Sequence, residues 1–315
     1  MKILITGGSG FIGGRLAHHL DLNGHHIRLI TRNQKISHHL KNIEITNFDW
    51  TNLNEIENKC RDIDVVVHAA GVNSYDSGKD PLSALSFNGL GTANLVAAAI
   101  NARVKRFIYI STAHVYSNPL IGVITEKNCL NNYHAYATSH VAGENFLIGA
   151  SSEKKIEGLV IRLSNAFGAP VHAGVDCWGL LVNDLCRQSI EKKRLVLRSK
   201  GLQERNFIAL KDVCLTIEAL INMRDYDKSN NILNLGSINK KVIEMAKLIQ
   251  QHVEVLFGYS PEIETNFLKN EMIGELKFES LGLKNYGIEV RENMIEEIEE
   301  LLLFCKEYFN YKEAS

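Results

Sequence analysis

The chain has 315 residues, of which 45% are hydrophobic and 23% are charged, and its 35 basic and 36 acidic side chains leave a formal net charge of -1. This length and composition are typical of a globular protein with a sizeable core in one large or two modest domains. The balanced charge argues against nucleic acid or an anionic membrane as a partner.

The N-terminal segment, MKILITGGSGFIGG, is too short in apolar length and too rich in glycine for a secretory signal. No stretch reaches the ~18 apolar residues that a membrane span needs. The six cysteines are scattered without a CxxC pair, which predicts reduced thiols and a cytoplasmic location. Three adjacent histidine pairs occur without a cysteine or carboxylate cluster beside them, so we expect no metal.

The first two-thirds of the chain alternates short apolar runs with helical patterns. Strands are expected at Lys2 to Thr6, Ile27 to Ile30, Ile43 to Ile45, Val65 to Val67, Phe107 to Ile110 and Leu159 to Ile161. Helices are expected between most of them, notably at Phe11 to Leu22, Leu82 to Asn101 and Tyr133 to Ala150. This alternation predicts an α/β fold with a Rossmann-type doubly wound parallel sheet, covered by helices on both faces.

The pattern changes after Gly168, where mixed short elements replace the regular alternation. Helices are expected at Trp178 to Ile190, Asp212 to Met223 and Arg291 to about Tyr311, and strands at Leu195 to Leu197 and Ile232 to Leu235. We expect an NAD(P)-binding Rossmann domain at 1–168 plus about 205–236. A smaller C-terminal substrate-binding lobe would comprise about 169–204 plus 237–315.

Three glycines, Gly7, Gly10 and Gly13, follow the first expected strand and open a helix. Glycine permits a tight turn and a close approach of the backbone to a pyrophosphate. The start of the helix, at Phe11 and Ile12, offers free N–H groups and the positive end of the helix dipole. The segment therefore predicts a dinucleotide site, with a purely structural glycine turn as the alternative.

The residues after the second strand bear on the choice of cofactor. A carboxylate there would bind the ribose of NAD, whereas an arginine accommodates the 2′-phosphate of NADP. This chain has Thr31-Arg32-Asn33, with no carboxylate. Arg32 therefore favours NADP over NAD, unless it is an ordinary solvated surface residue.

Six further motifs follow the glycine loop along the chain. They are His68 to Gly71, Asn88 to Leu95, Ser111 to Tyr116, Arg162 to Gly168, Arg205 to Ile208 with Asp212-Val213, and Leu281-Gly282. Their order and spacing resemble the extended short-chain dehydrogenase/reductase superfamily, in its NAD-dependent epimerase/dehydratase branch. The resemblance extends over nearly the whole chain and implies a nucleotide-sugar substrate.

The resemblance implies roles for the matching residues. Tyr136 would transfer the proton and Thr112 would bind the reacting oxygen, while the cofactor carries the hydride. Asn165 and Arg205 match positions that meet the substrate's diphosphate. Cofactor contacts are implied for Asp49 at the adenine and, along the cofactor, for Ala69, Ala70, Gly71, Tyr136 and His140. Each residue type also has an ordinary structural use, as a cap, a turn residue or a packing group.

One position departs from the family pattern, because His140 stands where YxxxK has its lysine. That lysine binds the nicotinamide ribose and lowers the pKa of the tyrosine by its charge. A fixed charge ~4 Å away is worth about 4 kcal/mol at an effective dielectric of about 20, which is on the order of three units of tyrosine pKa. Loss of this charge would slow oxidation, which needs tyrosinate, more than it would slow reduction. We expect His140 to act as a weakened ribose anchor.

We therefore expect an NAD(P)-dependent nucleotide-sugar oxidoreductase or epimerase that transfers hydride at a sugar carbinol carbon, with C4 favoured, as a ketoreductase or an epimerase. The alternative is a catalytically weak NAD(P)-binding sensor or scaffold, and reduction of a non-sugar carbonyl ranks last. Dehydration is disfavoured because Ala113 and His114 replace the Asp-Glu of sugar dehydratases. A homodimer would pair through the helices at Leu82 to Asn101 and Tyr133 to Ala150.

Overall fold

The computed structural model describes residues 1–31, 41–227, 229–266 and 273–309, so Arg32 lies outside the described residues. Its centre is a seven-stranded sheet in the order β11-β7-β5-β4-β1-β2-β3. Every neighbouring pair in it is parallel, as the predicted α/β fold requires. The strands are β1 (Lys2–Thr6), β2 (His26–Ile30), β3 (Ile43–Thr46), β4 (Val65–His68), β5 (Arg106–Thr112), β7 (Glu157–Leu163) and β11 (Ile232–Leu235).

Helices cover both faces of this sheet, and the strands are apolar on both sides for that reason. Ile3 and Ile5 of β1 pack into one cluster with α1 (Phe11–Leu22) and α8 (Leu210–Asn222). Leu4, which points to the opposite face, packs with α2 (Leu53–Cys60), α5 (Thr92–Asn101) and α6 (Ala135–Ser152). The two-residue period of the strand thus divides a single apolar run between two cores.

The strand order reverses beside β1. The chain proceeds from β1 outward through β2 to β3, and then returns to the other side of β1 for β4 and β5. In open parallel sheets a ligand binds at such a reversal, in the crevice outside the carboxyl ends of the strands. The topology therefore places the candidate site next to Thr6 and His68, where β1 and β4 end.

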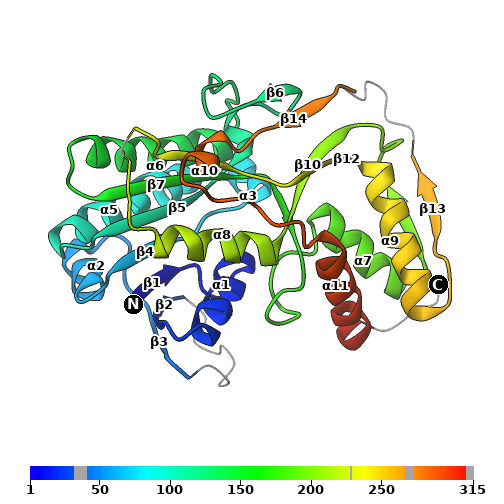
Figure 1. Cartoon of the computed structure of the whole chain (residues 1–315), viewed down its shortest axis with the longest axis horizontal. Coiled ribbons are helices and arrows are strands. Elements are labelled where there is room, and N and C mark those ends of the chain that lie inside the picture. The colour runs from blue at the N-terminus through cyan, green and yellow to red at the C-terminus, as the bar shows by residue number, and fades with distance from the viewer. Residues whose placement is uncertain (32–40, 228, 267–272, 310–315) are drawn as a thin grey trace.

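The other strands form three small sheets: β12-β10-β8, β13-β9 and β14-β6. Helices α7 (Leu181–Glu191), α9 (Val242–Phe257) and α11 (Met294–Tyr308) enclose a separate core with β8, β9 and β10. Figure 1 shows these helices at the end of the molecule opposite α2 and α5. The bounds are β6 (Gly122–Ile124), β8 (Asn165–Phe167), β9 (Arg194–Leu197), β10 (Glu204–Ala209), β12 (Ile238–Lys241), β13 (Glu262–Thr265), β14 (Leu276–Phe278) and α10 (Leu281–Asn285).

Within residues 205–236, β11 joins the central sheet beside β7, whereas β10 pairs with β8 and β12 in a small sheet. The division of the chain into a 1–168 plus 205–236 domain and a second lobe stays a prediction.

The segment that we expected as one helix from Leu82 to Asn101 has three parts. It begins with α4 (Pro81–Ala84), continues through a π-helical turn at Leu85–Gly91 and ends with α5. By length and composition this stretch could cross a membrane, but half of its apolar window is buried inside the protein. Such burial is expected of a helix that covers a sheet.

Candidate active site

A pocket of about 840 Å³ lies at the carboxyl edge of the central sheet, where the topology predicts a ligand. Most of the candidate residues line it. They are Gly7, Gly10, Phe11, Ile12 and Gly13 of the glycine loop, Ala69, Ala70 and Gly71 after β4, and Thr112, Tyr136, His140 and Asn165. The structure thus brings together segments as far apart in sequence as Gly7 and Asn165.

The glycine loop is closed too tightly for side chains. Gly7 has a φ of +72°, and a Cβ at Gly13 would lie 2.4 Å from the carbonyl oxygen of Gly7. The N-cap of α1, Gly10, offers no capping side chain, and the first helical bond joins the Gly14 N–H to the Gly10 carbonyl. The N–H groups of Phe11, Ile12 and Gly13 precede that bond and border the pocket. This cradle fits a dinucleotide diphosphate.

Aromatic rings form the wall beyond the glycine loop. The ring of Trp50 lies 4.8 Å from the rings of both Phe48 and Phe87, and all three line the pocket. Asp49, for which we expected an adenine contact, is exposed and does not line the pocket. Its carboxylate accepts hydrogen bonds from the N–H and the hydroxyl of Thr51, which lower the pKa of Asp49. The local turn therefore competes for this carboxylate, and the expected adenine contact stays a prediction.

Thr112 and Tyr136 meet at the other end of the pocket. Thr112 is the last residue of β5, and its hydroxyl accepts the His114 N–H at 3.1 Å. Tyr136 lies in the first turn of α6 and hydrogen-bonds Thr112. Burial raises the pKa of the Tyr136 phenol, and the Thr112 bond opposes that rise only in part. The phenol is therefore protonated and able to donate.

His140 lies one helical turn beyond Tyr136, and the edge of one ring faces the other at a centroid distance of 4.7 Å. Its Nδ1 is 2.8 Å from the hydroxyl of Tyr109, a buried residue of β5. Burial lowers the pKa of His140 to about 4, so the imidazole is neutral near pH 7. It therefore cannot supply the charge of the lysine that it replaces.

Asn88, in the π-helical turn, connects two segments of the pocket wall by hydrogen bonds. Its Oδ1 accepts the Val72 N–H at 2.8 Å, and its Nδ2 donates to the Ser139 hydroxyl at 3.0 Å. A Cβ at Gly143 would lie 2.7 Å from the Asn88 carbonyl oxygen, so α6 packs directly on this turn. Asn88 thereby fixes the backbone after Gly71 relative to α6.

A buried ion pair supports Thr112 from behind. Arg162 of β7 donates to Glu144 of α6 at 2.6 Å, and both side chains are almost fully buried. Ser111 donates its hydroxyl proton to the same carboxylate. The Arg162 guanidinium also lies over the ring of Tyr116, 4.9 Å from its centroid. These contacts hold the end of β5 against α6.

The two expected substrate contacts differ. Asn165 of β8 lines the pocket, and its Nδ2 donates to the Asn206 carbonyl oxygen at 2.8 Å. Arg205 is exposed on β10 and does not line the pocket. Its charge still reaches His114, because the pKa of His114 is lowered mainly by burial and further by Arg205. Asn165 therefore lines the pocket and Arg205 does not, and both substrate contacts stay predictions.

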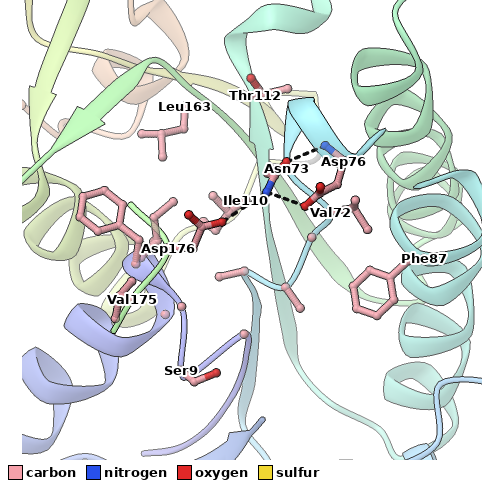
Figure 2. Close-up of a pocket in the computed structure, with 18 of the residues that line it drawn as sticks. Ser9, Val72, Asn73, Asp76, Phe87, Ile110, Thr112, Leu163, Val175 and Asp176 are labelled. Atoms are coloured by element: carbon pink, nitrogen blue, oxygen red, sulfur yellow. Dashed lines mark hydrogen bonds between the residues drawn. The ribbon is translucent and has the colours of Figure 1, made fainter. Parts of the chain in front are cut away.

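Sequence reasoning missed a polar cluster at the middle of the pocket. The Nδ2 of Asn73 donates to Asp76 at 2.9 Å and to Asp176 at 3.5 Å. Figure 2 shows Asn73 between the two carboxylates, with Ser9 and Thr112 on opposite sides of the cluster. Asp176 comes from the loop before α7, 103 residues beyond Asn73. The only sequence signal was that both loops interrupt the regular elements.

Three residues that line the pocket each hold a buried polar atom without a hydrogen-bond partner: His114 Nδ1, Ser164 Oγ and His172 Nε2. His114 had a weak signal in its position beside Thr112, and the other two had none. Within the described ranges, no group of three His, Cys, Asp or Glu side chains is placed to hold a metal ion. The expectation of no metal stays a prediction.

The comparisons with known proteins agree on one relationship. A model of the NAD dependent epimerase/dehydratase family matches residues 3–236. UDP-glucuronic acid decarboxylase 1 of Xenopus tropicalis is 25% identical over 264 residues, 80% of this chain but only 60% of that protein's length. dTDP-D-glucose 4,6-dehydratase of Bos taurus is 26% identical over 333 residues, 99% of this chain and 91% of that protein.

Among solved structures, UDP-glucuronic acid 4-epimerase from Bacillus cereus in complex with NAD has a TM-score of 0.82 to this chain. The two are 21% identical, and the match covers 100% of this chain and 99% of the other. At this identity the likeness establishes the fold, and the whole length of the chain shares it.

Proposed function

The chain belongs to the NAD-dependent epimerase/dehydratase family, and on this premise we propose that it is an NAD(P)-dependent enzyme that transfers hydride at a carbinol carbon of a nucleotide-linked sugar. The observation that carries the proposal is the pairing of Thr112 with Tyr136 in one pocket with the glycine loop. The family relationship supports the general reaction type, and C4 is our proposal for the carbon.

The character of the pocket supports a polar substrate. His114, Ser164 and His172, each with a buried unpartnered polar atom, line it together with Asn73 and Asp76. A buried polar atom without a partner costs about 1–3 kcal/mol, which a hydroxyl-rich ligand would recover. A sugar offers such hydroxyls, whereas a largely apolar ketone does not, so a non-sugar carbonyl remains the weakest option.

The residues suit proton transfer to or from a sugar oxygen. A bound nicotinamide would supply or accept the hydride. Thr112 would donate a hydrogen bond to the reacting oxygen, and the phenol of Tyr136 would protonate it as the carbonyl is reduced. Because burial raises the pKa of Tyr136 and His140 brings no charge, the protonated phenol is favoured. This favours reduction over oxidation, and hence a ketoreductase over an epimerase.

Dehydration needs a separate acid and base. The curated relatives include 4,6-dehydratases, but here Ala113 and His114 stand at the positions of the Asp-Glu pair. His114 has an unpartnered Nδ1 at the pocket, which is the most specific observation in favour of elimination. A single neutral imidazole is a poor replacement for two carboxyl groups, so we rank dehydration below reduction.

The competing proposal is a sensor or scaffold that binds NAD(P) without useful turnover. Its support is the neutral His140, because a tyrosine without a neighbouring charge is a poor base. The glycine loop and the aromatic wall would be the same in both cases. Only the measured reaction separates the two.

The test is turnover of 4-keto nucleotide sugars with NADH or NADPH, followed by the absorbance of the reduced nicotinamide and by NMR of the sugar product. We expect reduction at C4. Tyr136→Phe should lower the rate about a hundredfold to ten-thousandfold, whereas Tyr133→Phe, at an exposed tyrosine three residues earlier, should not. His140→Lys should preserve or raise turnover. Tight cofactor binding without any turnover would favour the sensor, and a 4-keto-6-deoxy product from dTDP-glucose would favour a dehydratase.

Three further expectations stay proposals. NADP preference depends on Arg32, which lies outside the described residues, so comparative binding of NADP(H) and NAD(H) has to decide it. A homodimer is supported by exposed apolar side chains on the expected helices, namely Leu82, Leu85 and Leu90 with Phe146 on α6. Cytoplasmic location is likewise a proposal.

A further inference from the structure

Three rings from three elements lie in series behind the Thr112 end of the pocket. His68 ends β4, Tyr109 lies in β5, and His140 lies in α6. The rings of His68 and Tyr109 are stacked at 5.2 Å, and those of Tyr109 and His140 at 5.8 Å. All three residues are buried. Buried imidazoles of this kind have few ways to arrange their hydrogens, which makes the arrangement deducible.

The hydrogens around His68 follow from its partners. The hydroxyl of Thr92 donates to the Asn88 carbonyl at 2.6 Å, so it can only accept from His68 Nε2, 2.9 Å away. Burial lowers the pKa of His68 to about 3, so the ring carries one hydrogen, which is on Nε2. Its Nδ1 then accepts from the Thr6 hydroxyl at 2.7 Å. Each of these groups has its partner.

The position of the hydrogen on His140 follows in the same way from its partner, Tyr109. A phenol is a good donor and imidazole nitrogen is a good acceptor, so the favoured arrangement has the Tyr109 hydroxyl donating to Nδ1 at 2.8 Å. Thr92 is the other potential acceptor for that hydroxyl, but its oxygen already accepts from His68, and an imidazole nitrogen is the stronger acceptor. With burial raising the pKa of Tyr109 and lowering that of His140 to about 4, both groups stay neutral.

The remaining nitrogen of His140 faces the pocket. A Cβ built at Gly71 would lie 3.8 Å from Nε2 and 3.6 Å from Cε1, and both Gly71 and His140 line the pocket. If Nδ1 accepts from Tyr109, Nε2 carries the hydrogen and is a donor beside Gly71. A larger residue at position 71 would block that direction.

We propose that Tyr109 is a positioning residue that holds His140 as the Nε2–H tautomer, so that His140 offers the pocket an uncharged hydrogen-bond donor in place of an ammonium group. The acceptor, a ribose hydroxyl of the dinucleotide, rests on the proposed function; the tautomer does not. The chain thus keeps the donor role of the missing lysine and gives up its charge. Cofactor affinity should then show no step from His140 between about pH 5.5 and about pH 8.

The test is nitrogen NMR of histidine-labelled protein without added cofactor, which distinguishes the two neutral tautomers and the imidazolium. We expect His140 to be the Nε2–H tautomer and to stay neutral down to about pH 5. In Tyr109→Phe the Nδ1 atom loses its donor, so His140 should become a mixture of tautomers. NAD(P)H affinity should fall about fivefold to tenfold in the same variant, as for the loss of one oriented hydrogen bond.

The matched control is Tyr226→Phe. Tyr226 is a half-buried tyrosine that, like Tyr109, makes side-chain hydrogen bonds, in its case to Gly158 and Ser151, but it does not border the pocket. It should leave both the His140 tautomer and the cofactor affinity unchanged. An Nδ1–H tautomer in the unaltered protein would overturn the proposal, as would a His140 that titrates near its ordinary pKa. If Tyr109→Phe does not fold, the tautomer of the unaltered protein decides alone. Absence of turnover would refute the proposed function and leave the tautomer result standing.

Discussion

At the glycine-loop end of the pocket the wall is main chain, whereas at the Thr112 end it is built from side chains. Gly7, Gly10 and Gly13 contribute peptide groups and the start of α1, with no capping side chain. Thr112 and Tyr136 contribute hydroxyls, and buried polar side chains such as Ser111 and Glu144 pack behind them. The glycine-loop end depends on the absence of side-chain atoms, and the Thr112 end depends on hydrogen bonds between particular side chains. A Cβ added at Gly7 or Gly13 would collide with main chain, whereas at the Thr112 end His140 takes the place of a lysine with a hydrogen-bond partner of its own, Tyr109.

The largest effect should come from the buried pair behind the Thr112 end. Glu144→Ala leaves Arg162 buried without its partner, which should cost about 3–5 kcal/mol of unfolding free energy. Urea denaturation measures it. Glu153→Ala removes an exposed partner of Lys155 and should change little. Equal losses in the two variants would show that the side-chain end does not depend on this pair.

The main-chain end is tested by adding one carbon. In Gly13→Ala the new Cβ would lie 2.4 Å from the Gly7 carbonyl oxygen and 2.8 Å from the Gly7 carbonyl carbon, neither of which can move freely. Overpacking of this kind should weaken dinucleotide binding about a hundredfold, measured by calorimetry. Gly149→Ala, in α6 with no atom within 4 Å of its Cβ, is the control and should bind normally. Normal binding by Gly13→Ala would remove the distinction between the two ends.

The smallest effect is the change in unfolding free energy for each unit of pH. His68 and His140 have pKa values lowered to about 3 and about 4, below their ordinary 6.5. The unfolded chain therefore binds protons that the folded chain does not, so stability is full above pH 6.5 and is lost as pH falls toward 4. Each histidine should contribute up to about 1.4 kcal/mol per pH unit. Thermal unfolding at a series of pH values measures the slope.

Two variants show whether the buried histidines cause the dependence of unfolding free energy on pH. His140→Gln should reduce it, whereas His18→Gln, at an exposed histidine of α1, should not. A slope that survives in His140→Gln, or that disappears in His18→Gln, would assign the acid sensitivity to other groups.

Much of the fold was predictable because its signals are local. The apolar run at β1 and the run at β11 were located to the residue, and the glycine loop was identified from its spacing and its place between an expected strand and an expected helix. Tyr136 and Thr112 were identifiable because the family pattern surrounds them. The central sheet followed from the alternation of strands and helices, since that pattern has few topological solutions.

The rest depended on contacts that no local pattern reveals. Asn73 and Asp176 meet across 103 residues of sequence, and β10 pairs with β8 and β12 rather than with a strand of the central sheet. The turn at Asp49, in which Thr51 donates to its carboxylate, is likewise visible only in the structure. Tyr109 looked like an ordinary strand residue until its hydroxyl was found beside His140.

The arrangement of α6 has a consequence for insertions and deletions. Tyr136, Ser139, His140, Gly143 and Glu144 recur at intervals of three and four and so share one side of the helix. That side meets Thr112, Asn88, Tyr109 and Arg162 in turn. One inserted residue would rotate everything beyond it by about 100°. The proposed proton donor, the proposed cofactor contact, the close packing and the charge pairing would then fail together, so this stretch can change its residues but not its length.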